Sequence, residues 1–160
     1  MHFLVVLARL CAIGAGVLLT VITLMTCTSI VGREFLGAAI TGDFELSGAA
    51  TGAAIGLFMP WCQAKRGNII VDFFTAKCSD STNQAMDRMG ALFVCACFAL
   101  LAWRTYLGGV SAYASHSGTM ILGFPEWIVF AVMSPAFALT SVIALFQTFV
   151  GFDETLGEAA

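Results

Sequence analysis

The feature that most constrains this chain is an apolar segment with acids at one end and bases at the other. Asp43 and Glu45 precede it, the segment runs from Leu46 to Cys62, and a Lys-Arg pair follows at 65–66. A helix carries a partial positive charge at its N-terminus and a partial negative charge at its C-terminus, so both ends are electrostatically matched. A helix from Asp43 to Ala64 has 22 residues and would be about 33 Å long at about 1.5 Å per residue, enough to cross the hydrocarbon core of a bilayer.

Composition extends this argument to the whole chain. Of the 160 residues, 59% are hydrophobic and 11% are charged, whereas a soluble domain is about one-quarter charged. A small soluble core cannot bury so much apolar surface. We therefore predict an all-α integral membrane protein, a single membrane domain over 1–160 with four transmembrane helices at 10–31, 44–64, 89–110 and 125–150. The net charge of −3 and the lack of a basic patch argue against nucleic-acid binding.

Local signals refine three of these spans. The first apolar run is longer than the core of a signal peptide, which predicts a retained transmembrane helix. Pro125 is expected in the first turn of the fourth helix, and Pro135 near its middle is expected to kink it. Arg104 interrupts the third run directly after Trp103.

An amphipathic segment lies between the second and third spans. If 69–78 is helical, Ile69, Ile70, Phe73, Phe74 and Lys77 fall on or near one face. That pattern predicts an interfacial helix on the cytoplasmic side, with Lys77 reaching the headgroups. The alternative is one continuous helix into the third span, but the polar run 79–83 favours a break.

The basic residues predict the orientation, because cytoplasmic loops are enriched in Lys and Arg. With the N-terminus inside, five of the seven bases are cytoplasmic and two are not. The five are Arg9, Lys65, Arg66, Lys77 and Arg88, and the two are Arg33 and Arg104. Both termini are therefore expected in the cytoplasm.

Glycines repeat every four residues in the second span, at Gly48, Gly52 and Gly56, with alanines around them. Helices associate in lipid where small residues let their backbones approach closely. This face is expected to dock either a partner helix or another helix of the same chain. Both alternatives make Gly52 intolerant of a bulky side chain.

Arg104 is costly if it lies inside the membrane. It can extend outward as an interfacial anchor, pair with Asp43, Glu45 or Glu126, or take part in transport. The indoles of Trp61, Trp103 and Trp127 lie near predicted span ends and are interpreted as interface anchors.

Residues for catalysis or metal binding are not grouped in this sequence. The two histidines are His2 and His116, and none of the six cysteines forms a C-x-x-C pair. Every acid lies at a span end or in a loop, whereas ion-coupled transporters need buried carboxylates or broken helices. The chain is therefore interpreted as a scaffold that is not an enzyme and has no cofactor.

The second span and its exit also carry a resemblance. An acidic pair, an apolar helix, Gln63 and a hydrophobic segment ending in Val71-Asp72 resemble the small membrane subunit of tripartite ATP-independent periplasmic (TRAP) transporters. In that family the turn usually reads Gly-Gly-His-Ile-x-Val-Asp. Here Arg66 takes the place of the first glycine and Asn68 that of the histidine.

The resemblance implies a bacterial inner-membrane protein that binds a larger membrane subunit. The larger subunit would carry the solute and sodium sites, and a periplasmic binding protein would deliver the solute, commonly an organic acid. The motif maps to Glu45, Gln63, Gly67, Ile69, Val71 and Asp72, and Pro125, Trp127 and Pro135 resemble the last span of the family. Two other functions remain open: a self-contained four-helix transporter, or the membrane anchor of a redox enzyme.

Overall fold

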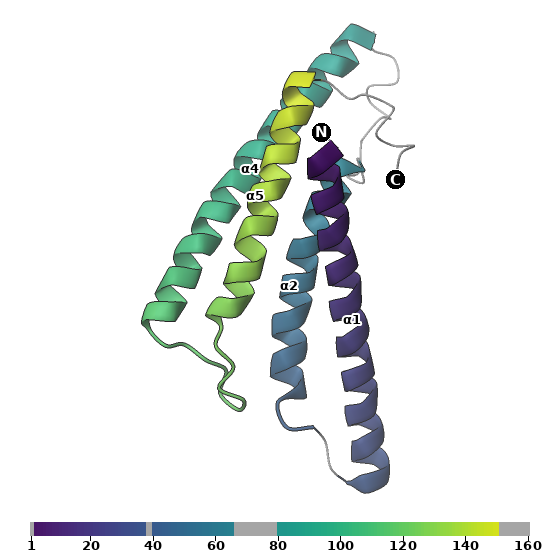
Figure 1. Cartoon of the computed structure of the whole chain (residues 1–160), viewed down its shortest axis with the longest axis vertical. Helices are drawn as coiled ribbons and strands as arrows, with labels where there is room; N and C mark the ends of the chain where they lie inside the picture. Colours follow the sequence, from purple (N-terminus) through teal and green to yellow (C-terminus); the bar gives the residue numbers. More distant parts are fainter. Residues whose placement is uncertain (1, 38–39, 66–79, 151–160) are drawn as a thin grey trace.

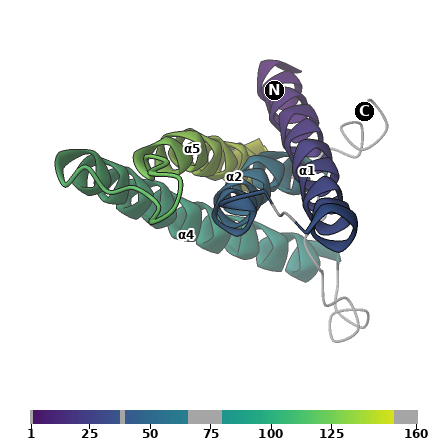
Figure 2. The same ribbon diagram turned by 90° about the horizontal axis from the view of Figure 1, so that it is seen from below.

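The computed structural model describes residues 2–37, 40–65 and 80–150. Its four long helices are α1 (His2–Leu36), α2 (Asp43–Ala64), α4 (Asp80–Ala114) and α5 (Trp127–Val150). They form two antiparallel hairpins, α1–α2 and α4–α5, which meet where α2 packs against α5 (Figure 1). Viewed along the bundle, α2 lies between α1 and the α4–α5 pair (Figure 2).

Buried apolar side chains in the described part of the chain are mostly alanines, whereas large apolar side chains point outward. The buried set is Ala8, Ala15, Ile22, Ala53, Ala54, Ala91, Ala112, Ala136, Ile143 and Ala144. Phe3, Leu10, Phe93, Leu100 and Phe149 are all more than half exposed. This distribution is the reverse of that in a soluble bundle and suits helices that approach closely while their outer faces contact lipid.

Three of the described helices contain stretches that are long and apolar enough to cross a membrane: Phe3–Phe35, Arg88–Ala114 and Trp127–Phe149. The all-α membrane architecture is therefore confirmed for these three. Helix α2 begins and ends close to the predicted 44–64, but its composition does not reach the same hydropathy. Its role as a fourth span remains a prediction.

Hydroxyl groups of α5 tie it to α4. Ser141 donates to the backbone carbonyl of Cys95 at 3.0 Å, and Ser134 donates to that of Ala102 at 3.3 Å. Thr140 is fully packed and donates to the carbonyl of Ala136 within α5 at 2.9 Å. Such bonds satisfy hydroxyls that lipid cannot solvate.

Two local predictions differ from the structure. Residues 80–83 are helical, because Asp80 opens α4. Asp, Ser, Thr and Asn suit the start of a helix as well as a turn, so this polar run begins α4 instead of lying in a loop before it. The proposed interfacial helix over 69–78 lies outside the described residues.

Pro125 precedes α5 and does not lie in its first turn. It pairs with Gly118 in an isolated antiparallel bridge, and its carbonyl accepts a hydrogen bond from the N–H of Ile128 at 3.3 Å. The α4–α5 loop (115–126) folds back on itself, since the N–H of Thr119 donates to Phe124 and that of Glu126 donates to Ser117. The tight loop occupies the residues that a longer helix would need. The predicted kink at Pro135 stays a prediction.

Candidate functional site

Glu45 joins the two hairpins. Its carboxylate oxygens accept hydrogen bonds from the backbone N–H of Ile121 at 3.1 and 3.2 Å and from that of Leu122 at 3.2 Å. The side chain of Leu122 lies against Gly42, where any Cβ would overlap it. Gly42 also has a φ of 80°, which favours glycine. The start of α2 is thus fastened to the α4–α5 loop by one carboxylate and one apolar contact.

We expect Glu45→Ala to release this loop from α2. The N–H groups of Ile121 and Leu122 would lose a charged acceptor, so their hydrogen exchange should accelerate on the order of tenfold. The measurement is residue-resolved hydrogen exchange on the detergent-solubilised protein. Glu34→Ala is the control, because Glu34 is exposed and holds no backbone N–H in the described residues. Unchanged exchange at both amides in Glu45→Ala would show that the carboxylate does not hold the loop.

Asp43 closes the turn between α1 and α2. The buried hydroxyl of Ser29 donates to Asp43 Oδ2 and accepts a hydrogen bond from the N–H of Ile40 at 3.2 Å. The Ser29 hydrogen bond lowers the pKa of the Asp43 carboxyl, and the N–H of Phe44 and the charge of Arg33 lower it further, while desolvation opposes them. Asp43 precedes the predicted span, so it can exchange protons with water.

This lowered pKa predicts an acid sensitivity. The folded state binds the Asp43 proton less readily than the unfolded state, so the stabilisation is present above the unfolded pKa. It is lost as the pH falls through the lower, folded pKa. We expect the melting temperature to fall less steeply with acidification in Ser29→Ala than in the wild type. Thr28→Ala is the control, since among the described residues the Thr28 hydroxyl bonds only to the carbonyl of Leu24 in its own helix. Parallel curves for Ser29→Ala and the wild type would contradict the assignment.

Gln63 and Gln147 form a buried pair across the interface of α2 and α5. Gln63 Nε2 donates to Gln147 Oε1 at 2.7 Å, and Gln147 Nε2 donates to the carbonyl of Gln63 at 3.0 Å. Each side chain is 5% exposed. The motif made Gln63 a candidate for a partner-interface or structural role, and in the described residues its side chain lies in a contact between α2 and α5.

The three glycines spaced every four residues along α2, Gly48, Gly52 and Gly56, lie in two different environments. A Cβ at Gly56 would lie 3.1 Å from Met133 Cγ of α5, so this glycine is packed inside the chain. Around Gly48 and Gly52 nothing lies within 4 Å of the Cβ position. Beside them Thr51 and Ile55 are exposed. The two sequence alternatives therefore apply to different residues: Gly56 packs internally, and Gly48 and Gly52 border an open face.

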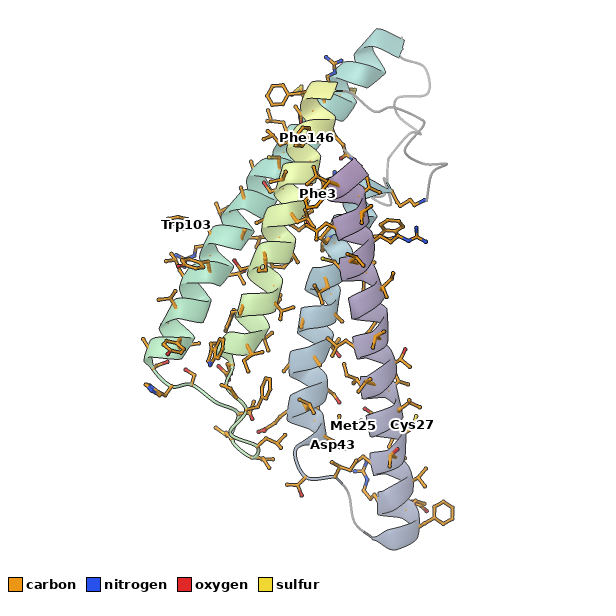
Figure 3. The ribbon with its side chains drawn as sticks, viewed as in Figure 1. Phe3, Met25, Cys27, Asp43, Trp103 and Phe146 are labelled. Carbon is orange, nitrogen blue, oxygen red and sulfur yellow. The ribbon has the colours of Figure 1, made fainter. Side chains whose placement is uncertain are left out.

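Arg104 and the three tryptophans occupy distinct positions. Arg104 is exposed on α4, and no ion pair joins it to Asp43, Glu45 or Glu126 among the described residues. Trp103 is exposed and projects away from the bundle (Figure 3). At a rise of about 1.5 Å per residue, Trp103 lies about 16 Å before the C-terminal end of α4. Trp127 is the first residue of α5, and the ring of Trp61 lies 5.4 Å from Lys65 Nζ.

Several predicted residues fall outside the described ranges, namely Gly67, Asn68 and Asp72 of the motif and Phe73, Phe74 and Lys77 of the amphipathic segment. Conversely, the sequence did not single out Ser29 or the amides of Ile121 and Leu122. A serine that is buried in the helix preceding an acidic helix start has no recognisable sequence pattern. Backbone amides in a loop give none either.

Comparison with known protein families shows to which family this chain belongs. The model of the tripartite ATP-independent periplasmic transporters, DctQ component, matches residues 22–153. The chain belongs to this family. No curated protein and no solved structure gave a significant match. The resemblance drawn from Glu45, Gln63 and the segment after them is thereby confirmed.

Family membership gives the helices their context. A DctQ component is a membrane component of a TRAP transporter, and the three apolar helices agree with that setting. The matched region contains the whole of α2, α4 and α5 and the second part of α1. It therefore includes the Glu45 contact, the glutamine pair and the open glycine face of this DctQ chain.

Proposed function

We propose that this DctQ chain is the non-catalytic small subunit that scaffolds the larger, solute- and sodium-binding membrane subunit of its transporter. The observation that carries the proposal is the open face of α2 around Gly48 and Gly52. Small residues allow a partner helix to approach the backbone closely. The lower hydropathy of α2 adds a second reason, because a helix that suits lipid poorly is better covered by protein.

The distribution of charge supports a bracing role over a transport pathway. Asp43 and Glu45 lie in the first turn of α2, and both are engaged in holding turns together. Glu126 lies in the loop before α5. The buried polar side chains Ser29, Gln63, Thr140 and Gln147 bond to other groups of the same chain. A fixed, internally satisfied bundle suits the static counterpart of a moving subunit.

The proposed topology has four spans, with α2 as the fourth apolar crossing and both termini in the cytoplasm of a bacterium. Residues 69–78 form a cytoplasmic interfacial helix in this proposal, anchored by Phe73, Phe74 and Lys77. The inner membrane is the compartment that a component acting with a periplasmic partner requires.

The proposed partners are the large TRAP membrane subunit, a periplasmic solute-binding protein and the surrounding lipids. The solute is an organic acid or a similar molecule brought by the binding protein. Gly67, Asn68, Asp72 and Arg104 are further candidates for a role in the partner interface or in the structure of this chain.

Tagging this chain in its native membrane tests the proposal. The large subunit is expected to co-purify, and the complex with its binding protein is expected to take up solute under a sodium gradient. The chain alone is expected to transport nothing in proteoliposomes. Transport by the isolated chain would instead identify a self-contained transporter and overturn the scaffold role. A haem absorbance spectrum would indicate a redox anchor.

A further inference from the structure

An apolar groove of about 530 Å³ lies between α4 and α5, near the ends joined by the 115–126 loop. Tyr106 and Tyr113 of α4 and Trp127 and Phe130 of α5 line it, and Ala138 is the lining residue furthest along α5. The face of α5 that meets α2 carries Met133 and Gln147, which do not line this groove. The groove is therefore separate from the proposed docking face.

Water is a poor occupant for this space. Its lining is mostly apolar, so water molecules inside it would find few hydrogen-bond partners. An empty groove would forfeit dispersion contacts along both helices. Both helices that form the groove are apolar enough to span a membrane. With both helices crossing a membrane, the groove would face hydrocarbon.

The dimensions of the groove match one leaflet. From Trp127 to Ala138 along α5 is about 16 Å at about 1.5 Å per residue, roughly half of a hydrocarbon core of about 30 Å. At the end of the groove next to the 115–126 loop, called its outer end below, the rings of Tyr113 and Trp127 meet edge to face, with their centroids 5.7 Å apart. Such aromatic groups favour the level of the lipid headgroups.

The outer end also carries hydrogen-bond donors without partners. No described residue accepts a hydrogen bond from the hydroxyl of Tyr113 or from the indole N–H of Trp127. A phospholipid places ester and phosphate oxygens at this depth, above its acyl chains. The donors and the apolar wall therefore fit the two halves of one molecule.

We propose that this groove binds an acyl chain of a phospholipid from the leaflet on the side of the 115–126 loop. Tyr113 and Trp127 hydrogen-bond the ester or phosphate oxygens of that lipid, and the chain lies along Phe130 and Ala131 towards Ala138. The site depends on the membrane setting of α4 and α5 and does not depend on how α2 meets its partner.

The test is lipid retention by the full chain, measured by native mass spectrometry. Delipidated protein in maltoside micelles is titrated with dioleoylphosphatidylglycerol. Ala131→Phe puts a ring into the groove from an exposed position, and Ala96→Phe is the control on an exposed position of α4 outside the groove. We expect the occupancy of the one-lipid state to fall about tenfold in Ala131→Phe and to stay unchanged in Ala96→Phe.

Tyr113→Phe provides a second arm that keeps the shape of the groove. It should weaken retention several-fold, since it removes one unpartnered donor. Equal retention by the wild type, Ala131→Phe and Tyr113→Phe would overturn the proposal. Loss of the large subunit in Ala131→Phe with unchanged lipid retention would overturn it as well, because the groove would then be a protein interface.

Discussion

Replacing Gly52 by leucine is expected to leave this chain folded and to remove the large subunit from the purified complex. The added side chain meets nothing within 4 Å of its Cβ in this chain. Leucine also favours a helix over glycine by about 0.8–1 kcal/mol, so α2 itself should not weaken. In the complex, the same side chain would hold the partner helix away from the backbone of α2. The co-purified large subunit should fall on the order of tenfold or more.

Two matched glycines separate docking from folding. Gly14 of α1 is exposed and equally open, so Gly14→Leu should affect neither the melting temperature nor the complex. Gly56 packs on Met133, so Gly56→Leu should destabilise the chain itself by about 1–3 kcal/mol through overpacking. If Gly52→Leu retains the large subunit at the level of Gly14→Leu, the open face of α2 is not the docking site.

Replacing Gln147 by leucine is expected to produce the second-largest effect, on the stability of the chain. The substitution removes two hydrogen bonds between α2 and α5. One joins the side chains of Gln63 and Gln147, and the other joins the Gln147 side chain to the backbone carbonyl of Gln63. Interhelical hydrogen bonds in membranes contribute about 0.6 kcal/mol on average and up to about 1.7 kcal/mol. A buried amide left without its partner costs about 1–3 kcal/mol. We expect a loss of about 1–2 kcal/mol in the free energy of unfolding.

A double-mutant cycle with Gln63→Leu isolates the pair. The double variant should lose less than the sum of the single variants, because no amide is then left facing an apolar side chain. Thr148→Val is the control, since within the part of the chain that the structure describes its hydroxyl bonds only to the carbonyl of Ala144 in α5. Additive losses in the cycle would show that the two glutamines do not stabilise each other.

Charge and hydropathy were enough to predict where the helices lie, because these depend on local composition. The ends of α2 agree with the predicted span to within one residue, since Asp43 and Lys65 mark them in the sequence. The extent of α4 was underestimated, because a polar run is compatible with both a turn and a helix start. The sequence pattern around Pro125 gave no sign that the loop would fold back and pair it with Gly118.

Contacts between distant residues were harder to predict than the helices. The roles of Glu45 and Gln63 depend on the 115–126 loop and on Gln147, which lie far along the chain. Spacing along one helix cannot indicate which neighbour covers each face. For this reason Gly56 and Gly52 looked equivalent in the sequence, although one packs on Met133 and the other is open.

The crossing of α2 through the bilayer is the premise on which the docking account rests, and cysteine labelling tests it most directly. Phe44→Cys and Lys65→Cys, each in a background without native cysteines, are exposed to a membrane-impermeant maleimide in right-side-out and inverted vesicles. We predict that the cysteine at position 44 reacts from the periplasmic side and the one at 65 from the cytoplasmic side. Reaction of both from one side would mean that α2 does not cross the bilayer, and would contradict the account.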